Sequence, residues 1–183
     1  MAFIESIPPR AKVPHVLARF NTGTGRPLVE FHEALLRGES PFSIAERELM
    51  AAFVSGTNAC RYCFGAHSAA ARHFGVEPEL LAALVTDIGT ADVPAHLKPV
   101  LHFLRKLTLT PARMQQADAD AVFAAGWTER ALYDAVQICA LYNFMNRFVE
   151  GLGLDVHAED FDAEGRMIHD GGYAAMLGTF GIR

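Results

Sequence analysis

Two cysteines and a histidine in the middle of the chain have a spacing that suits thiol chemistry. Cys60, Cys63 and His67 follow one another at intervals of three and four residues. Because an α-helix turns by about 100° per residue, the three side chains share an arc of about 60° if 59–74 is helical. A helix here therefore places both sulfurs and the imidazole on one face.

The two sulfurs have different reasons to ionise. Cys63 and His67 are separated by the i to i+4 step at which helical side chains meet, so His67 could accept the Cys63 proton or stabilise its thiolate. Cys60 lies near a helix N-terminus with an expected N-cap at Thr57 or Asn58, where backbone N–H groups and the helix dipole favour a negative sulfur. The residues alone leave open which cysteine is the thiolate.

A carboxylate on the preceding helix could complete a proton relay. On one unbroken helix, Glu48 would project about 120° away from the face that carries Cys60. The stretch 56–58, Gly-Thr-Asn, breaks the helix. Two helices that pack antiparallel or cross can then bring Glu48 towards His67, and a Glu beside a His beside a Cys is an arrangement of general acid–base catalysis.

Other interpretations of these residues stay open. Both cysteines could be small core residues, with His67 a structural histidine and Glu48 a solvated charge. A zinc site needs further ligands, which Glu48, His73 or His102 could supply, but the sequence holds no second CxxC pair. Cys139 lies on an apolar helix and is interpreted as a core residue.

The elements that must position these residues are predicted to be helices throughout. Helix formers dominate and alternating strand-like segments are missing, so the fold class is all-α. Ser43 and Glu46 match a capping box at the start of the helix that carries Glu48. Pro8, Pro9 and Pro14 indicate an extended arm over 1–13. Helices are expected at about 15–20, 27–36 with Pro27 as the first residue, 44–56, 59–74, 77–87, 95–107, 114–124 and 128–152, with a possible short helix near 159–168.

The chain divides into three expected segments. These are an N-terminal arm and short helix over 1–26, a helical domain over 27–155, and a C-terminal extension over 156–183 that packs on the same domain. The sequence shows no low-complexity linker and no internal repeat between them.

Composition limits the kinds of binding partner and the cellular compartment that we expect. Of 183 residues, 51% are hydrophobic and the net charge is -5. A helical monomer of this size could not bury all of this apolar surface, which predicts a homo-oligomer. Lys and Arg are scattered singly and form no basic stripe, so we expect no nucleic-acid partner. No apolar run reaches the ~20 residues of a membrane span, and no signal peptide is evident. We therefore expect a cytoplasmic protein without a membrane partner, and in that compartment a CxxC is more often catalytic or metal-binding than a structural disulfide.

The set of Glu48, Cys60-x-x-Cys63 and His67 after a capped helix resembles the signature of the AhpD-like alkylhydroperoxidases, in the carboxymuconolactone decarboxylase superfamily. The stretch 132–154 is similar to the closing helix of the peroxidase-related branch. The resemblance covers about residues 28–155 and implies an all-helical AhpD-like fold with the CxxC at a helix N-terminus. It also implies a homo-oligomer, often a trimer or hexamer.

The resemblance implies roles for the four residues. Cys63 would be peroxidatic and form a sulfenic acid, Cys60 would donate a proton and then resolve the sulfenic acid as a disulfide, and His67 with Glu48 would form the relay. An organic hydroperoxide or H2O2 would be the substrate, and an external lipoyl or thioredoxin-like dithiol would be the reductant. No haem, flavin or metal is implied.

The predicted function is thus a thiol-dependent peroxidase. Its alternatives are a dithiol–disulfide oxidoreductase without peroxidase activity and a noncatalytic helical oligomer for binding or assembly. Asn143 or Arg147 could reach the site, although such polar faces are more often solvated or line subunit contacts. Aromatic side chains near the dithiol could line a pocket, although a core role suits most of them: Phe53, Tyr62, Phe64 and Phe74.

Overall fold

The computed structural model describes residues 2–183 and is all-α, as predicted. Met1, where the expected arm begins, lies outside the described residues. The α-helices are α1 (Val13–Phe20), α2 (Gly25–Arg37), α3 (Ile44–Thr57), α4 (Arg61–His73), α5 (Pro78–Thr86), α6 (Lys98–Leu109), α7 (Gln116–Ala124), α8 (Glu129–Leu152), α9 (Phe161–Gly171) and α10 (Ala175–Phe180). Short 3-10 turns precede α6, α7 and α9: η1 (Ala95–Leu97), η2 (Pro111–Arg113) and η3 (Ala158–Asp160).

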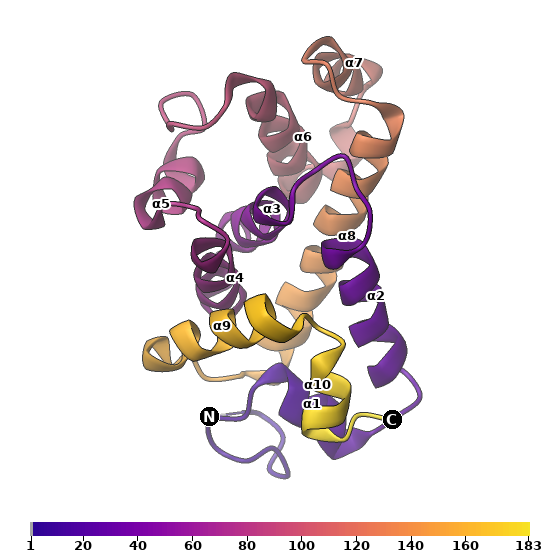
Figure 1. Cartoon of the computed structure of the whole chain (residues 1–183), viewed down its shortest axis with the longest axis vertical. Helices are drawn as coiled ribbons and strands as arrows, with labels where there is room; N and C mark the ends of the chain where they lie inside the picture. The colour runs from indigo at the N-terminus through magenta and orange to yellow at the C-terminus, as the bar shows by residue number, and fades with distance from the viewer. Residues whose placement is uncertain (1) are drawn as a thin grey trace.

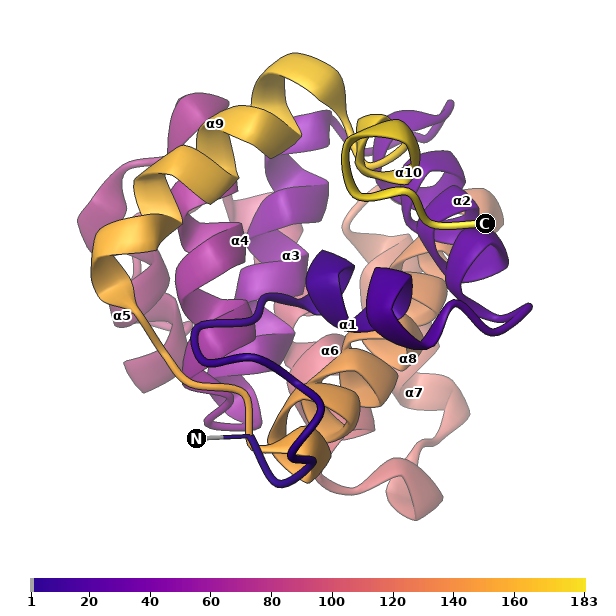
Figure 2. The same cartoon turned by 90° about the horizontal axis from the view of Figure 1, so that it is seen from below.

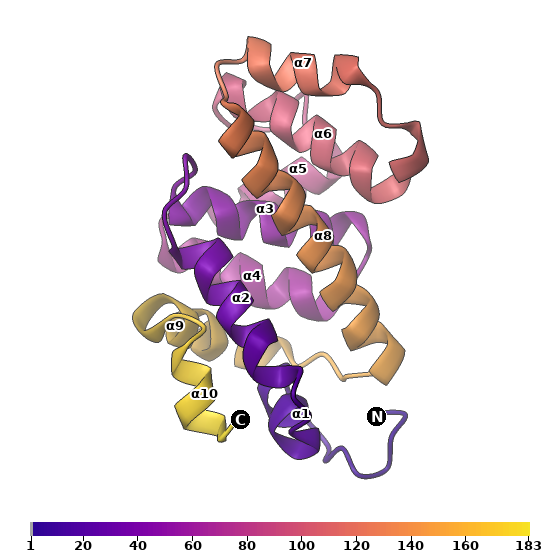
Figure 3. The ribbon, with the colours of Figure 1, turned by 90° about the vertical axis from the view of Figure 1, so that its right-hand side faces the viewer.

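A central pair of helices, α3 and α4, organises the molecule. They run side by side, and the long helix α8 crosses them (Figure 3). Helix α6 packs on α3 and α8, whereas α9 packs on the far side of α4 (Figure 1). Since α3 touches neighbours all round, nine consecutive residues of this helix, 47–55, are buried. The helix that carries Glu48 is therefore the core of the fold.

Local sequence signals fix several helix ends. Ser43 is the N-cap of α3, and the reciprocal bonds between Ser43 and Glu46 form the predicted capping box. The Thr128 hydroxyl accepts from the backbone N–H of Ala131 at the start of α8. Gly153 ends α8 in the left-handed conformation, which favours glycine. These caps confirm the predicted starts of α3 and α8 and the glycine end of α8.

Prolines near the N-terminus interrupt less structure than the sequence suggested. Pro14 lies inside the first turn of α1, and Pro27 is the third residue of α2 instead of the first. The first N–H groups of a helix have no intrahelical acceptor, so proline is tolerated there. The arm itself, residues 2–12, is not extended, because hydrogen bonds from Ile7 N to Ile4 O and from Ala11 N to Pro8 O fold it into turns.

The C-terminal residues contain more helix than predicted. Helix α9 extends to Gly171, and α10 had no counterpart in the sequence analysis. Helix α9 approaches α4 closely at Gly165, where an added Cβ would lie 2.6 Å from the backbone carbon of Ala69. The missing side chain of Gly165 therefore lets α9 lie against α4, next to the face of α4 that carries His67.

Candidate active site

The connection between α3 and α4 sets the position of the dithiol. Ala59 adopts a left-handed backbone with φ of 56°, and Cys60 is the N-cap of α4, with Cys63 in the first turn. The N-cap expected at Thr57 or Asn58 is wrong, because α3 continues to Thr57 and Asn58 caps its C-terminus. The helical angle assumed for Cys60 fails with it, since the Cys60 backbone is extended. The CxxC nevertheless lies at a helix N-terminus, as predicted.

The α3–α4 pair brings Glu48 and His67 together, as the break between their helices suggested. Glu48 Oε2 and His67 Nδ1 are 2.8 Å apart, and both side chains are buried. An ionised carboxylate only accepts hydrogen bonds, so Nδ1 carries the hydrogen and donates it. In the tautomer that carries its hydrogen on Nδ1, the lone pair of Nε2 is available to accept a proton.

Two residues outside the predicted set hold the other oxygen of Glu48. The Arg37 guanidinium, from the end of α2, lies 2.7 Å from Oε1. The Tyr173 hydroxyl, between α9 and α10, donates to the same oxygen at 2.8 Å. Neither residue gave a sequence signal, since one lies 11 positions before Glu48 and the other 125 positions after it.

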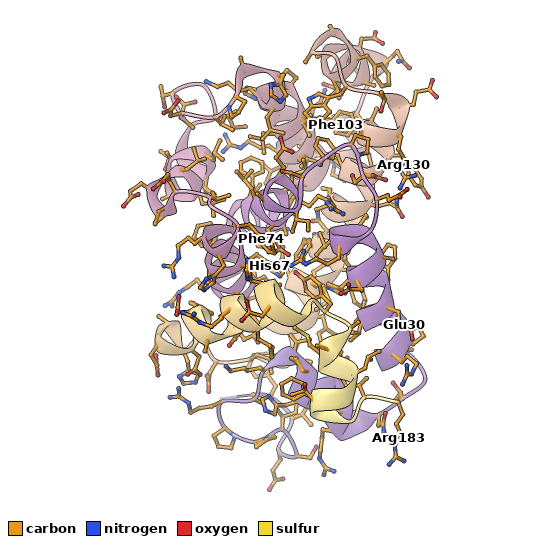
Figure 4. The ribbon with its side chains drawn as sticks, in the orientation of Figure 1. Glu30, His67, Phe74, Phe103, Arg130 and Arg183 are labelled. Atoms are coloured by element: carbon orange, nitrogen blue, oxygen red, sulfur yellow. The ribbon has the colours of Figure 1, made fainter. Side chains whose placement is uncertain are left out.

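This network keeps Glu48 ionised although no part of it is exposed to solvent. Burial alone would raise the pKa of the carboxyl group, but the hydrogen bond and electrostatic attraction of His67, together with the positive charge of Arg37, outweigh it and hold the pKa below its usual value. The guanidinium of Arg37 is itself fixed over the rings of Phe74 and Tyr173, 5.0 Å from each centroid. Figure 4 shows His67 and Phe74 close to each other in the middle of the view, above α9.

Tyrosine rings enclose the imidazole of His67. The Tyr142 ring from α8 meets it edge-on with 4.5 Å between centroids, and the Tyr142 hydroxyl is 3.4 Å from Nδ1. The Tyr173 hydroxyl lies at the same distance from Nδ1. Since these contacts converge on Nδ1 and on one edge of the ring, they hold the imidazole in place and so orient Nε2.

The two thiols of the CxxC are reduced and differ in acidity. The hydrogen bond with Cys63 lowers the pKa of Cys60, against the opposing effect of burial. The pKa of Cys63 is raised by the hydrogen bond with Cys60 and by burial. Two adjacent thiols do not both ionise readily, because a second negative charge beside the first is unfavourable. The first proton therefore leaves Cys60, in line with its place at the helix N-terminus.

A cavity of about 390 Å³ opens beside the site, and only one of the two cysteines lines it. Cys63 and His67 both contribute to its wall, whereas Cys60 does not. The rest of the wall is largely apolar and comes from α1, α2, α8, α9 and α10, including Leu28, Val29, Met145, Met167 and Ile168. Of the four aromatic residues considered from sequence, Tyr62 lines the cavity and the other three do not.

The N-terminal arm covers Cys60. Cys60 is 1% exposed and packs in one apolar cluster with Ile7 and Ala11 of the arm and with Val149 and Leu154. Figure 2 shows the arm passing beside the end of α8. Ion pairs from Arg10 and Lys12 to the 159–164 region hold the arm in place.

The polar residues of α8 support the α3–α4 connection without reaching the cavity. The Asn58 amide donates to Asn146 at 2.8 Å and to Asn143 at 3.2 Å. Arg147 is exposed and donates to the backbone and side chain of Asn143. Asn143 and Arg147 therefore do not line the wall that Cys63 and His67 share.

The remaining sequence candidates lie elsewhere. His73 faces Asp162 on the surface, 3.3 Å from its carboxylate. Cys139 is buried, as expected, with Thr108 Oγ1 3.3 Å from its sulfur. Between residues 2 and 183, no three His, Cys, Asp or Glu side chains converge as they would to hold a metal ion.

Comparisons with known proteins place this arrangement in a class. The model of the carboxymuconolactone decarboxylase family matches residues 23–98, which contain Glu48, Cys60, Cys63 and His67. A solved structure of an uncharacterized peroxidase-related protein from Silicibacter sp. TM1040 is similar, with 30% identity and a TM-score of 0.73, over 80% of this chain and 78% of that one. Another, described as an alkylhydroperoxidase AhpD core and uncharacterized peroxidase-related protein from Ralstonia eutropha JMP134, has 26% identity and a TM-score of 0.71, over 78% of this chain and 75% of that one. The search of curated proteins gave no significant match.

The fold and the site thus define an all-α protein of the AhpD-like, peroxidase-related type. The chain belongs to the carboxymuconolactone decarboxylase family. None of the helices described between residues 2 and 183 combines the length and the apolar character of a bilayer span.

Proposed function

We propose that the protein is a thiol-dependent peroxidase that reduces hydroperoxides through a Cys60–Cys63 dithiol/disulfide cycle. The observation that carries this proposal is the wall of the cavity, where Cys63 and His67 meet the same apolar space and His67 is backed by buried Glu48. An apolar space of this size suits an organic hydroperoxide.

Access assigns the roles of the two sulfurs in this proposal. Cys63 lines the cavity and meets the substrate, whereas Cys60 lies beneath the arm. Because the first proton leaves Cys60, Cys63 becomes the attacking thiolate when its own proton passes along the Cys60–Cys63 hydrogen bond to Cys60. His67 Nε2 is the base that takes the proton released by the pair, and the resulting imidazolium is stabilised by Glu48.

The oxidative half of the cycle needs no reactant other than the hydroperoxide, because the two thiols supply both electrons and both protons. The Cys63 thiolate attacks the terminal peroxide oxygen, the O–O bond breaks, and the alkoxide takes a proton from Cys60 to leave as the alcohol. The Cys60 thiolate then attacks the sulfur of the sulfenic acid, which breaks the S–O bond and forms the disulfide. The departing hydroxide takes the proton held on His67 and leaves as water, so the two thiol hydrogens end on the alcohol and the water.

An external dithiol closes the cycle in this proposal. Thiol–disulfide exchange with a lipoyl or thioredoxin-like dithiol returns both cysteines to the reduced state. The reductant must reach a sulfur through the cavity or after displacement of the arm.

Mass spectrometry after brief exposure to an organic hydroperoxide tests the proposal. We expect a Cys60–Cys63 disulfide in the native protein and a trapped sulfenic acid on Cys63 in the Cys60→Ser variant. Cys139→Ser is the matched control and should form the same disulfide. Oxidation trapped on Cys60 in Cys63→Ser, with none on Cys63 in Cys60→Ser, would reverse the roles.

The near-complete burial of both sulfurs favours one competing function, a noncatalytic helical protein in which the cysteines only pack the core. Cys60 is 1% and Cys63 4% exposed. Alkylation across a pH series separates the two functions. A thiol that is alkylated at a pH well below the ordinary thiol pKa of ~8.5 supports the peroxidase. Thiols that stay unreactive over the whole series support the noncatalytic protein.

A further inference from the structure

The cavity contains a second histidine that the peroxidase chemistry does not use. His32 of α2 lines the cavity and is 7% exposed. Its Nδ1 lies 2.7 Å from the backbone oxygen of Leu28, one turn earlier in α2. A carbonyl oxygen can only accept, so Nδ1 carries the hydrogen and Nε2 of the neutral ring carries a lone pair.

The surroundings keep this ring neutral. Burial lowers the pKa of His32 to about 4; the bond to Leu28 and the charge of Glu48 oppose this without reversing it, and the interaction with His67 lowers the pKa further. The rings of Tyr142 and Tyr173 pack against His32 with centroid separations of 6.1 Å and 5.4 Å. At neutral pH His32 therefore offers an uncharged acceptor.

No hydrogen bond joins Nε2 of His32 to another group within residues 2–183, and this atom is not among the fully enclosed unpaired polar atoms. Because Nδ1 faces back to its own helix, Nε2 lies at the opposite edge of the ring, away from α2 and towards the cavity that the residue lines. An acceptor that opens onto an otherwise apolar cavity is the kind of polar group that orients a bound ligand, by accepting a hydrogen bond from it.

The nearby charges restrict what that ligand can be. Lys12, also on the cavity wall, is paired with Glu164 at 2.8 Å, so it is not free to bind a carboxylate. A neutral imidazole acceptor does not bind an anion. Glu164, which lies on the same wall, is already paired with Lys12, so a cation finds no free counter-charge either. An uncharged donor, such as a hydroxyl group on an otherwise apolar molecule, fits this wall best.

We propose that Nε2 of His32 is a specificity-determining acceptor, which selects apolar ligands that carry an alcohol group apart from the reacting end. His32 and His67 both pack on the ring of Tyr142. A ligand anchored at His32 thus lies beside the site where Cys63 acts. The reacting end, a hydroperoxide, rests on the proposed function, whereas the alcohol preference rests on the cavity alone.

Binding of unreactive probes tests the preference without turnover. The probes are propylbenzene and 3-phenylpropan-1-ol, which differ by one hydroxyl group, titrated into the reduced full-length protein by calorimetry. We expect His32→Leu to weaken binding of the alcohol about tenfold and to leave binding of the hydrocarbon within about twofold. Met167→Leu, another change on the wall at a residue without hydrogen bonds, should not alter the ratio of the two affinities.

A spectroscopic readout on the native protein covers the case in which His32→Leu does not fold. The nitrogen-15 resonance of His32 Nε2 should shift when the alcohol binds and stay in place when the hydrocarbon binds. Equal shifts with both probes, or binding of neither probe, would overturn the inference.

The experiment separates this inference from the peroxidase proposal. If no hydroperoxide oxidises Cys63 but the alcohol still binds through His32, the peroxidase proposal fails and the cavity inference stands. If Cys63 is oxidised by hydroperoxides but His32 responds to neither probe, the peroxidase proposal stands and the preference for an alcohol fails.

Discussion

At the scale of single residues, the most constrained group is the carboxylate of Glu48. Each of its oxygens is paired: one with His67, the other with Arg37 and Tyr173. A buried charge of this kind is tolerated only because it is paired and hydrogen-bonded. The same contacts that make Glu48 acceptable in the core also orient His67, so stability and reactivity depend on one network.

Removing the charge of Glu48 should affect both properties. In Glu48→Gln, Arg37 stays buried without a counter-ion, and we expect the free energy of unfolding to fall by about 3 kcal/mol. The oxidation rate of Cys63 should fall roughly a hundredfold because His67 loses the group that stabilises its imidazolium. Denaturant unfolding and single-turnover oxidation measure the two effects.

Tyr173→Phe is the matched control for that variant. It removes one hydrogen bond and leaves the charges in place, so the expected loss of unfolding free energy is about 1 kcal/mol. If both variants lost the same stability, the charge pairing of Glu48 with Arg37 would not be the main interaction that stabilises this network.

The neutral state of His32 predicts a pH dependence of stability. Its pKa is about 4 in the folded protein, against an ordinary value of 6.5, so the unfolded chain binds the proton first as pH falls. Stability should therefore decrease from about pH 6.5 to about pH 4, by roughly 3 kcal/mol, and this loss should level off below pH 4. Denaturant unfolding over a pH series measures the slope.

His32→Phe should remove this slope, whatever its effect on absolute stability. Glu48 acts in a different window, since its pKa is lowered on folding and its contribution is lost only below its unfolded value of 4.5. An unchanged slope between pH 6.5 and 4 in His32→Phe would contradict the assignment.

At the scale of elements, the connection between α3 and α4 shows which features of the site could be predicted from the sequence and which could not. Glycine and asparagine signals predicted the break correctly, and with it the meeting of Glu48 and His67. The left-handed Ala59, which makes Cys60 the N-cap, has no sequence signal, because alanine strongly favours helix. Arg37 and Tyr173 were missed because long-range contacts leave no periodic pattern in the chain.

The arm is a second element with a testable role, because it covers Cys60. Arg10 ties it to Glu159 and Asp160 through exposed ion pairs at 3.0 Å. Exposed pairs contribute little and are screened by salt, so we expect Arg10→Ala to raise the alkylation rate of Cys60 by about threefold. Added salt should have the same effect on the native protein.

The control for the arm is another exposed arginine with an ion pair. Arg26 pairs with Glu30 on α2, away from the arm, and Arg26→Ala should leave alkylation of Cys60 unchanged. A rate that is equal in the Arg10→Ala and native proteins at low salt would show that the arm is not what limits access.

At the scale of the whole molecule, composition and capping signals were enough to predict an all-α fold and the positions of its main helices. The structure of the last 30 or so residues was harder to predict from the sequence, because short helices such as α10 depend on tertiary contacts more than on local propensity. The division into three segments stays a prediction.

The predicted homo-oligomer has a candidate face on α8. Tyr133 and Phe144 are 61% and 52% exposed, and with exposed Ala140 they lie along one side of this helix. Exposed apolar side chains in a row are typical of an interface. Sedimentation should show the native protein as an oligomer and Phe144→Asp as a smaller species.

Phe31→Asp provides the comparison for the oligomer test, because Phe31 is a similarly exposed phenylalanine on α2. It should sediment like the native protein. A native protein that sediments as a monomer at all concentrations would remove the proposed role of the α8 face.

The late position of Tyr173 affects the order in which the protein matures during synthesis. Glu48 leaves the ribosome 125 residues ahead of the hydroxyl that clamps it. Until that tyrosine emerges, the nascent polypeptide already holds both sulfurs and their histidine but lacks the final contact on the buried acid. A fully ordered reactive centre therefore assembles only after synthesis has passed this tyrosine.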